Sequence, residues 1–307
     1  LPEQPYRLEI TERGTLENLQ LRPAPRRAPA AGEVEIAVQA SGLNFRDLLN
    51  VLDLYPGDPG PIGAECAGVI VAVGPDVTDF TVGDEVLAMA PHSFSQYVMA
   101  ATAAVVHKPA TLSAAEAAAL PSVFVTAYYG LHELAGMKAG DRVLIHAAAG
   151  GVGMAAVQLA QVVGAEVFAT ASPGKWAALR AMGVKHLYHS RTVDFAAQLL
   201  ADTDGQGVEI ILNSLTGPGF IEANLAALAP GGYLVEMSKR DVWDAAQIAA
   251  VRPDVRYTLI DLIAVGHQQP ALLQTMLARI MALYAQKQLT PLPYTAFPIE
   301  QAIAAFR

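Results

Sequence analysis

A glycine-rich turn between an apolar strand and an Ala-rich helix is the segment of this chain best suited to bind a nucleotide. Residues 144–156 read LIHAAAGGVGMAA, so Ala148, Gly150 and Gly153 take the three glycine positions of a G-x-G-x-x-G pattern. Gly150 lets the backbone approach a pyrophosphate, Gly153 allows close helix–strand packing, and the helix N-terminus stabilises phosphate charge. A tight turn without a ligand is the alternative. We expect a dinucleotide site made of Ala149, Gly150, Gly151, Val152 and Gly153.

The residues after the next two strands favour one cofactor. An NAD site usually has an acidic residue on the second strand for the ribose hydroxyl. Here that strand is followed by Ser172 and Lys175 with no carboxylate, and Arg191 follows the third strand. Each cation alone could be an ordinary surface residue. A hydroxyl and two cations together suit a 2′-phosphate, which predicts NADPH.

The sequence argues against several other classes of site and partner. Cys66 is the single cysteine and the seven histidines lack metal-ligand spacing, so we expect no metal and a reducing, cytoplasmic setting. The net charge of −9 argues against a nucleic-acid partner. No apolar run is long enough to suggest a membrane span. The start without Met suggests a piece of a longer polypeptide, and proteolytic maturation would explain it equally well.

Two successive patterns of secondary structure are expected to position these residues. Up to about Pro109, short β-branched stretches alternate with Gly and Pro turns. From Thr111, Ser113 and Glu116 form a capping-box pattern, and strands then alternate with helices as far as Ile260. This alternation predicts a doubly wound parallel sheet. We predict an α/β chain, with a mostly β substrate domain at 1–115 and 263–307 and a nucleotide domain at 116–262.

The order of β domain, nucleotide domain and returning tail resembles the medium-chain dehydrogenases/reductases. Their zinc members use a Gly-His-Glu motif, but this chain reads Gly63-Ala64-Glu65 and lacks the histidine. Seven strings resemble the enoyl reductase domains of polyketide synthases: GLNFRD (42–47), LYPG (54–57), VTAYY (125–129), HAAAGGVG (146–153), SPGKW (172–176), LNSL (212–215) and EMSK (236–239). The resemblance implies a GroES-like substrate domain and a Rossmann domain. Ser238, where the family usually has Gly, and a missing terminal Gly-Lys-Val-Val strand are departures.

The resemblance also implies a reaction and roles for residues. Hydride from NADPH would attack the β-carbon of an enoyl thioester, and the enolate would be protonated at the α-carbon. Tyr55 matches a proton donor, while Lys239 and Asp261 match a paired donor or orienting set. Lys239 and Asp261 follow the fifth and sixth strands, whose carboxyl ends should face the ligand crevice. The remaining matches to cofactor or substrate contacts are Asn44, Thr126, Asn213, Leu215 and Met237.

The resemblance names partners as well. It implies an acyl carrier protein with a phosphopantetheine-linked enoyl chain, and neighbouring ketoreductase and dehydratase domains. Three alternatives stay open at this point. One is a stand-alone quinone or enone reductase, another is an NADPH-binding protein with a lapsed active site, and the third closes a cyclopropane on a halogenated substrate.

Overall fold

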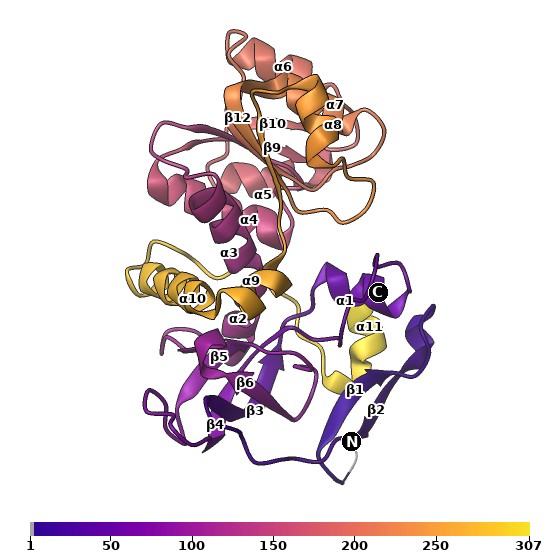
Figure 1. Ribbon diagram of the computed structural model, residues 1–307, viewed down its shortest axis with the longest axis vertical. Helices are drawn as coiled ribbons and strands as arrows, with labels where there is room; N and C mark the ends of the chain where they lie inside the picture. Colours follow the sequence, from indigo (N-terminus) through magenta and orange to yellow (C-terminus); the bar gives the residue numbers. More distant parts are fainter. Residues whose placement is uncertain (1–2) are drawn as a thin grey trace. The chain divides into compact units, whose positions relative to one another are not determined.

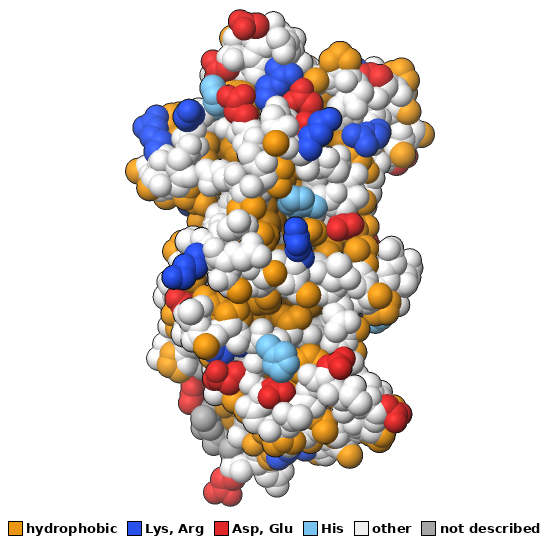
Figure 2. Space-filling model, turned by 90° about the vertical axis from the view of Figure 1, so that its left-hand side faces the viewer, with side chains coloured by type: hydrophobic (Ala, Val, Ile, Leu, Met, Phe, Trp, Pro, Cys, Tyr) orange, Lys and Arg blue, Asp and Glu red, His pale blue; other side chains and the backbone are white. Residues whose placement is uncertain are grey.

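The computed structural model describes residues 3–307, and the chain divides into two units. The first unit combines the chain up to Ser122 with Ala264–Arg307, and the second is Val123–Ile263. Across the described residues, no helix has the length and apolar character that crossing a membrane would require. On the face drawn in Figure 2, Lys and Arg side chains are interspersed with Asp and Glu and do not form one basic patch.

The first unit is built on a five-stranded antiparallel sheet with a separate two-stranded sheet. The five strands run in the order β6-β3-β4-β5-β7, and β1 pairs with β2. Val34, Ile36 and Ile70 alternate inward and are fully buried in its core. The strands are β1 (Tyr6–Ile10), β2 (Leu19–Pro23), β3 (Glu33–Ser41), β4 (Glu65–Val73), β5 (Glu85–Met89), β6 (Tyr97–Ala101) and β7 (Val105–His107).

Short helices and the returning C-terminal tail complete the first unit. Ser113 and Glu116 form the predicted capping box at the start of α2, with the Glu116 carboxylate accepting the Ser113 N–H at 2.8 Å. In the tail, α10 packs against β7, and Phe306 contacts Phe94 with ring centroids 6.0 Å apart. The helical segments are η1 (Leu16–Asn18), α1 (Phe45–Val51), η2 (Thr102–Ala104), α2 (Ala114–Ala118), α10 (Pro270–Ala285), η5 (Ile299–Gln301) and α11 (Ala302–Phe306).

The second unit is a six-stranded parallel sheet. Its order is β10-β9-β8-β11-β12-β13, so the chain moves outward in both directions from a switch point between β8 and β11. The strands are β8 (Arg142–Ile145), β9 (Glu166–Ala171), β10 (His186–His189), β11 (Val208–Asn213), β12 (Leu228–Glu236) and β13 (Arg256–Leu259). This sheet and the antiparallel sheet confirm the predicted Rossmann and GroES-like fold classes.

Helices connect the parallel strands and cover the sheet. In Figure 1, α6, α7 and α8 lie together around the strands at the top of the view, while α4 packs against β8 and β9. Phe168, Phe195 and Leu199 lie in the buried core between strands and helices. The helices are α4 (Gly151–Val163), η4 (Pro173–Lys175), α5 (Trp176–Ala181), α6 (Phe195–Asp202), α7 (Phe220–Ala227) and α8 (Ala245–Val251). Two helices, α3 (Pro121–Tyr128) and α9 (Leu262–Gln268), cross the boundaries between the units, and a π-helical segment, η3 (Tyr129–Leu134), follows α3.

Candidate active site

The glycine-rich turn lies at the carboxyl end of β8, beside the switch point of the parallel sheet. Gly150 is the N-cap of α4, and the first N–H groups of a helix have no intrahelical acceptor. A Cβ on Gly153 would lie 2.5 Å from the Cα of Ala148, so a larger residue would push the helix away from the turn. The turn therefore presents backbone N–H groups and a helix N-terminus, the features that bind a pyrophosphate.

The two predicted phosphate-binding cations lie on neighbouring loops of the same sheet edge. Lys175 is exposed after β9 and Arg191 is exposed after β10, and these two strands are paired. Among residues 3–307, neither side chain forms an ion pair. The Ser190 N–H donates to the Ala171 carbonyl oxygen at 3.2 Å and links the loops. Two solvent-facing cations beside half-buried Ser172 suit a phosphate ester.

A second polar cluster follows β11 and β12. The Asn213 amide donates to one oxygen of Glu236 at 2.5 Å, and the Ser238 N–H donates to the other at 2.7 Å. Burial raises the pKa of Glu236 to about 7. The Leu215 N–H donates to the Asn213 side-chain oxygen, and the Met237 N–H donates to the Asn213 carbonyl. Glu236 therefore fixes the loop that carries Met237. Sequence reasoning did not assign it a role.

Lys239 and Asp261 lie at this same edge of the sheet. The Lys239 ammonium donates to the Ile260 carbonyl oxygen at 2.6 Å, and Ile260 immediately precedes Asp261. Lys239 is half-buried, whereas the side chain of Asp261 is exposed. An ammonium has three N–H donors, so the contact with Ile260 orients the group and leaves donors for a substrate oxygen. Thr126, on α3, is half-buried.

Asn44 and Tyr55 belong to the first unit, at the two ends of α1. The Asn44 amide donates to Glu65 at 2.7 Å, and the other Glu65 oxygen accepts the Ser122 N–H at 2.7 Å. Burial raises the pKa of Glu65 to about 7. A Cβ on Gly42 would lie 2.4 Å from Glu65 Oε1, so this position requires glycine. Tyr55 is half-buried in the loop that follows α1.

The residues near Glu65 do not fit a zinc site. Ala64 stands where zinc enzymes have the histidine, and Cys66 is fully buried with a pKa raised by desolvation to about 12. Zinc binds the thiolate form of cysteine, which this environment disfavours. Within the described part of the chain, no group of three His, Cys, Asp or Glu residues could hold a metal ion.

Comparisons with known proteins match both units. Residues 30–110 match the alcohol dehydrogenase GroES-like domain, and residues 151–262 match the zinc-binding dehydrogenase family. The chain is 45% identical to the pikromycin synthase component PikAII of Streptomyces venezuelae in an alignment of 316 positions, which covers all of this chain and 8% of that protein. It is 47% identical over 309 residues, 99% of its length, to a type I phenolphthiocerol synthase of Mycobacterium tuberculosis that is named as inactive, and covers 19% of it.

The matches to solved structures cover nearly all of this chain and nearly all of the other chain. The CurK enoyl reductase aligns with a TM-score of 0.95 and 45% identity, covering 99% of this chain and 95% of that one. The CurF cyclopropanase from curacin A biosynthesis aligns with a TM-score of 0.93, 41% identity and the same coverage. A mycobacterial protein, Rv1454c, solved with NADPH, aligns with a TM-score of 0.88 and 26% identity over 99% and 95% of the two chains. The chain therefore belongs to the enoyl reductases of polyketide synthases, within the medium-chain dehydrogenases/reductases.

Proposed function

We propose that this domain uses NADPH to reduce the α,β-double bond of an enoyl thioester carried by an acyl carrier protein in a cytoplasmic polyketide synthase. The observation that carries the proposal is the single sheet edge that combines the glycine-rich turn, two exposed cations and the anchored Lys239. Ligands of open α/β sheets bind at this edge. The 45% identity with the CurK enoyl reductase supports a reductase activity for this domain.

The residues present fit a nicotinamide cofactor. Gly150 and the first turn of α4 would hold the pyrophosphate, because Gly153 lets that helix end approach the turn. Lys175 and Arg191, with Ser172, would hold the 2′-phosphate that distinguishes NADPH from NADH. Thr126, Asn213, Leu215 and Met237 would position the nicotinamide half. When bound, NADPH supplies the hydride for the β-carbon.

The chain's own groups would handle the charge and proton that follow. As an enolate develops on the thioester oxygen, a preorganised donor such as Lys239 stabilises it most when its position is already fixed. The hydrogen bond to Ile260 fixes Lys239 in this way. We assign α-carbon protonation to Tyr55, with Lys239 and Asp261 as the donor or orienting pair and Asn44 as a positioning group.

The substrate implies two reactions that must precede this one. A carrier-bound double bond conjugated to a thioester arises when a β-hydroxy thioester loses water, and the β-hydroxyl arises by ketone reduction. We therefore place the domain beside ketoreductase and dehydratase domains of one synthase. The matched synthases are much longer than this chain, which covers 8% and 19% of the two described above.

A kinetic comparison of substrates tests the proposal. The purified domain is given NADPH and one enoyl group in three forms: on a carrier protein, on a short pantetheine thiol, and as a free enone. We expect kcat/KM to be highest for the carrier-bound form. A preference for the free enone or a quinone would identify a stand-alone reductase, and NADPH binding without turnover on any form would identify a lapsed site. Formation of a cyclopropane from a halogenated substrate would instead identify a cyclopropanase, the activity in the name of the CurF relative.

A further inference from the structure

A buried chain of polar side chains lies directly beneath the glycine-rich turn. His146 Nδ1 is 2.9 Å from the Thr170 hydroxyl, and His146 Nε2 is 2.6 Å from Asn224 Oδ1. His146 follows β8, Thr170 lies in β9 and Asn224 lies in α7. All three side chains are at most 1% exposed. Buried polar groups without a ligand contact need a reason, because each must be desolvated.

With Asn224 Oδ1 facing the ring, as the structure has it, the direction of each His146 hydrogen bond follows. An amide oxygen only accepts, so His146 Nε2 carries the hydrogen that it donates to Asn224. In the neutral ring Nδ1 is then an acceptor, and the Thr170 hydroxyl must donate to it. Burial lowers the pKa of His146 to about 4, so the ring is neutral at physiological pH. The Thr170 oxygen keeps its lone pairs for one further donor.

That further donor is the backbone of the turn itself. The Ala147 N–H donates to the Thr170 hydroxyl oxygen at 3.2 Å, and the Ala148 N–H donates to the Thr170 carbonyl oxygen at 2.9 Å. Ala147 has φ of +48°, a left-handed conformation that residues with a Cβ rarely adopt. Such a conformation persists only where neighbouring contacts hold it. Thr170 supplies two of these contacts on consecutive residues.

We propose that His146, Thr170 and Asn224 are positioning residues that hold the turn at 147–150 in its phosphate-binding conformation before the cofactor arrives. The inference rests on the proposed nucleotide site and adds residues that do not contact the ligand. A preorganised turn loses less conformational freedom when the cofactor binds. Loss of these contacts should therefore raise the Kd for the cofactor. In the proposed reaction the hydride passes from the cofactor to the substrate and the proton comes from other residues, so kcat should change little.

Thr170→Val is the direct test, because valine has the shape of threonine without its hydroxyl. We expect the Kd for NADPH, measured by titration without substrate, to rise about fivefold to tenfold, as one lost hydrogen bond predicts. The kcat should stay within about twofold. Thr170→Ser keeps the hydroxyl and should restore the Kd. His146→Gln removes the acceptor at Nδ1 and should also raise the Kd, which covers the case in which Thr170→Val folds poorly.

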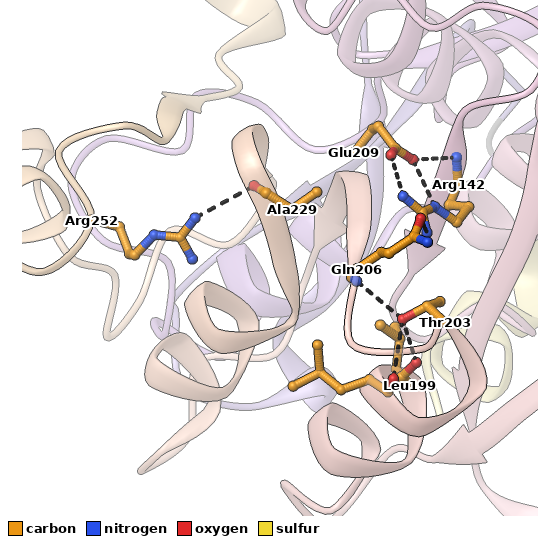
Figure 3. Close-up of polar contacts among 9 residues, drawn as sticks. Arg142, Leu199, Thr203, Gln206, Glu209, Ala229 and Arg252 are labelled. Atoms are coloured by element: carbon orange, nitrogen blue, oxygen red, sulfur yellow. Dashed lines mark hydrogen bonds and ion pairs between the residues drawn. The ribbon is translucent and has the colours of Figure 1, made fainter.

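Thr203 offers a matched control in the same unit. Its buried hydroxyl also donates one hydrogen bond, to the Leu199 carbonyl oxygen at 2.8 Å, and accepts one, from the Gly207 N–H at 3.0 Å. Figure 3 shows Thr203 beside Leu199 and near Gln206. Thr203 is the C-cap of α6, just before β11 begins, whereas the glycine-rich turn follows the carboxyl end of β8. Thr203→Val should therefore destabilise the unit without changing the Kd for NADPH. An equal rise in both variants would overturn the proposal.

Amide hydrogen exchange separates this inference from the proposed function. In cofactor-free protein, peptides covering 144–155 should exchange faster in Thr170→Val than in the wild type or in Thr203→Val. If the wild-type domain failed to bind NADPH, the proposed function would fall while the exchange result still tested the turn. Unchanged exchange together with an unchanged Kd in Thr170→Val would refute the positioning role.

Discussion

His146 gives the chain a definite acid sensitivity that one substitution should remove. Its pKa is lowered from 6.5 to about 4, first by burial, although the hydrogen bond with Asn224 opposes the shift. In the unfolded chain His146 is therefore protonated near pH 6.5, whereas in the folded chain it is protonated only near pH 4. The stability that His146 contributes is fully present above about pH 6.5 and is lost progressively as the pH falls from there to about 4, below which the loss is complete.

The size of the effect follows from the shift. One pKa unit corresponds to about 1.4 kcal/mol, so moving from about pH 7.5 to about pH 5 should remove about 2 kcal/mol of the unfolding free energy. His146→Gln does not titrate and should not show this loss. Glu65 and Glu236, whose pKa values are raised to about 7, act with the opposite sign. Both remain in the variant, so they cancel in the difference between the two proteins.

The assay is urea unfolding followed by tryptophan fluorescence. Both tryptophans, Trp176 and Trp243, lie in the Val123–Ile263 unit, so the signal reports the unit that contains His146. The unfolding free energies of the wild type and His146→Gln are compared at each pH. Wild-type stability should fall relative to the variant by about 2 kcal/mol across this range. Parallel profiles would show that His146 titrates normally and would refute the reasoning.

The remaining predictions concern the cofactor, metal and proton donor. Lys175→Ala should weaken NADPH at least tenfold, through loss of a charged hydrogen bond of about 1.5–3 kcal/mol, and leave NADH unchanged. Exposed Lys185→Ala is the control, and equal losses for both cofactors would contradict the assignment. Prolonged chelation should leave activity intact and elemental analysis should find no stoichiometric zinc; metal-restored activity would contradict this. Tyr55→Phe should lose rate at the low end of roughly 10²–10⁴-fold and scramble the α-methyl configuration. Unchanged configuration in chiral product analysis would favour Lys239 as donor.

Local sequence signals were sufficient for the fold class. The glycine-rich turn, the capping box at Ser113 and the alternation of strands and helices all depend on neighbours within a few residues, and the structure has each of them. Hydrogen-bond networks across the sheet depend instead on strand order. His146 contacts Thr170, 24 positions away, and Asn224, 78 positions away. No periodic pattern in a single sequence predicts that these three residues are in contact.

Glu236 and Glu65 show a signal that sequence reasoning left unused. Glu236 ends a run of apolar residues that predicts a buried strand, and a carboxylate in such a run needs hydrogen-bond partners. Its partner Asn213 is placed by the pairing of β11 with β12, whereas its other donor, the Ser238 N–H, lies two residues along the chain. In the sequence Glu65 stands out only as the neighbour of the missing histidine, whereas in the structure its carboxylate accepts hydrogen bonds from the Asn44 amide and the Ser122 N–H.

The proposed reduction of a carrier-bound double bond can be tested by following the hydride itself. The domain is incubated with NADPH that carries deuterium at the transferable position and with an enoyl group on a carrier protein, and the released acyl chain is analysed by mass spectrometry and NMR. We expect one deuterium at the β-carbon and a solvent proton at the α-carbon. An acyl chain that keeps its double bond, from a domain shown to bind NADPH, would contradict the proposed reduction.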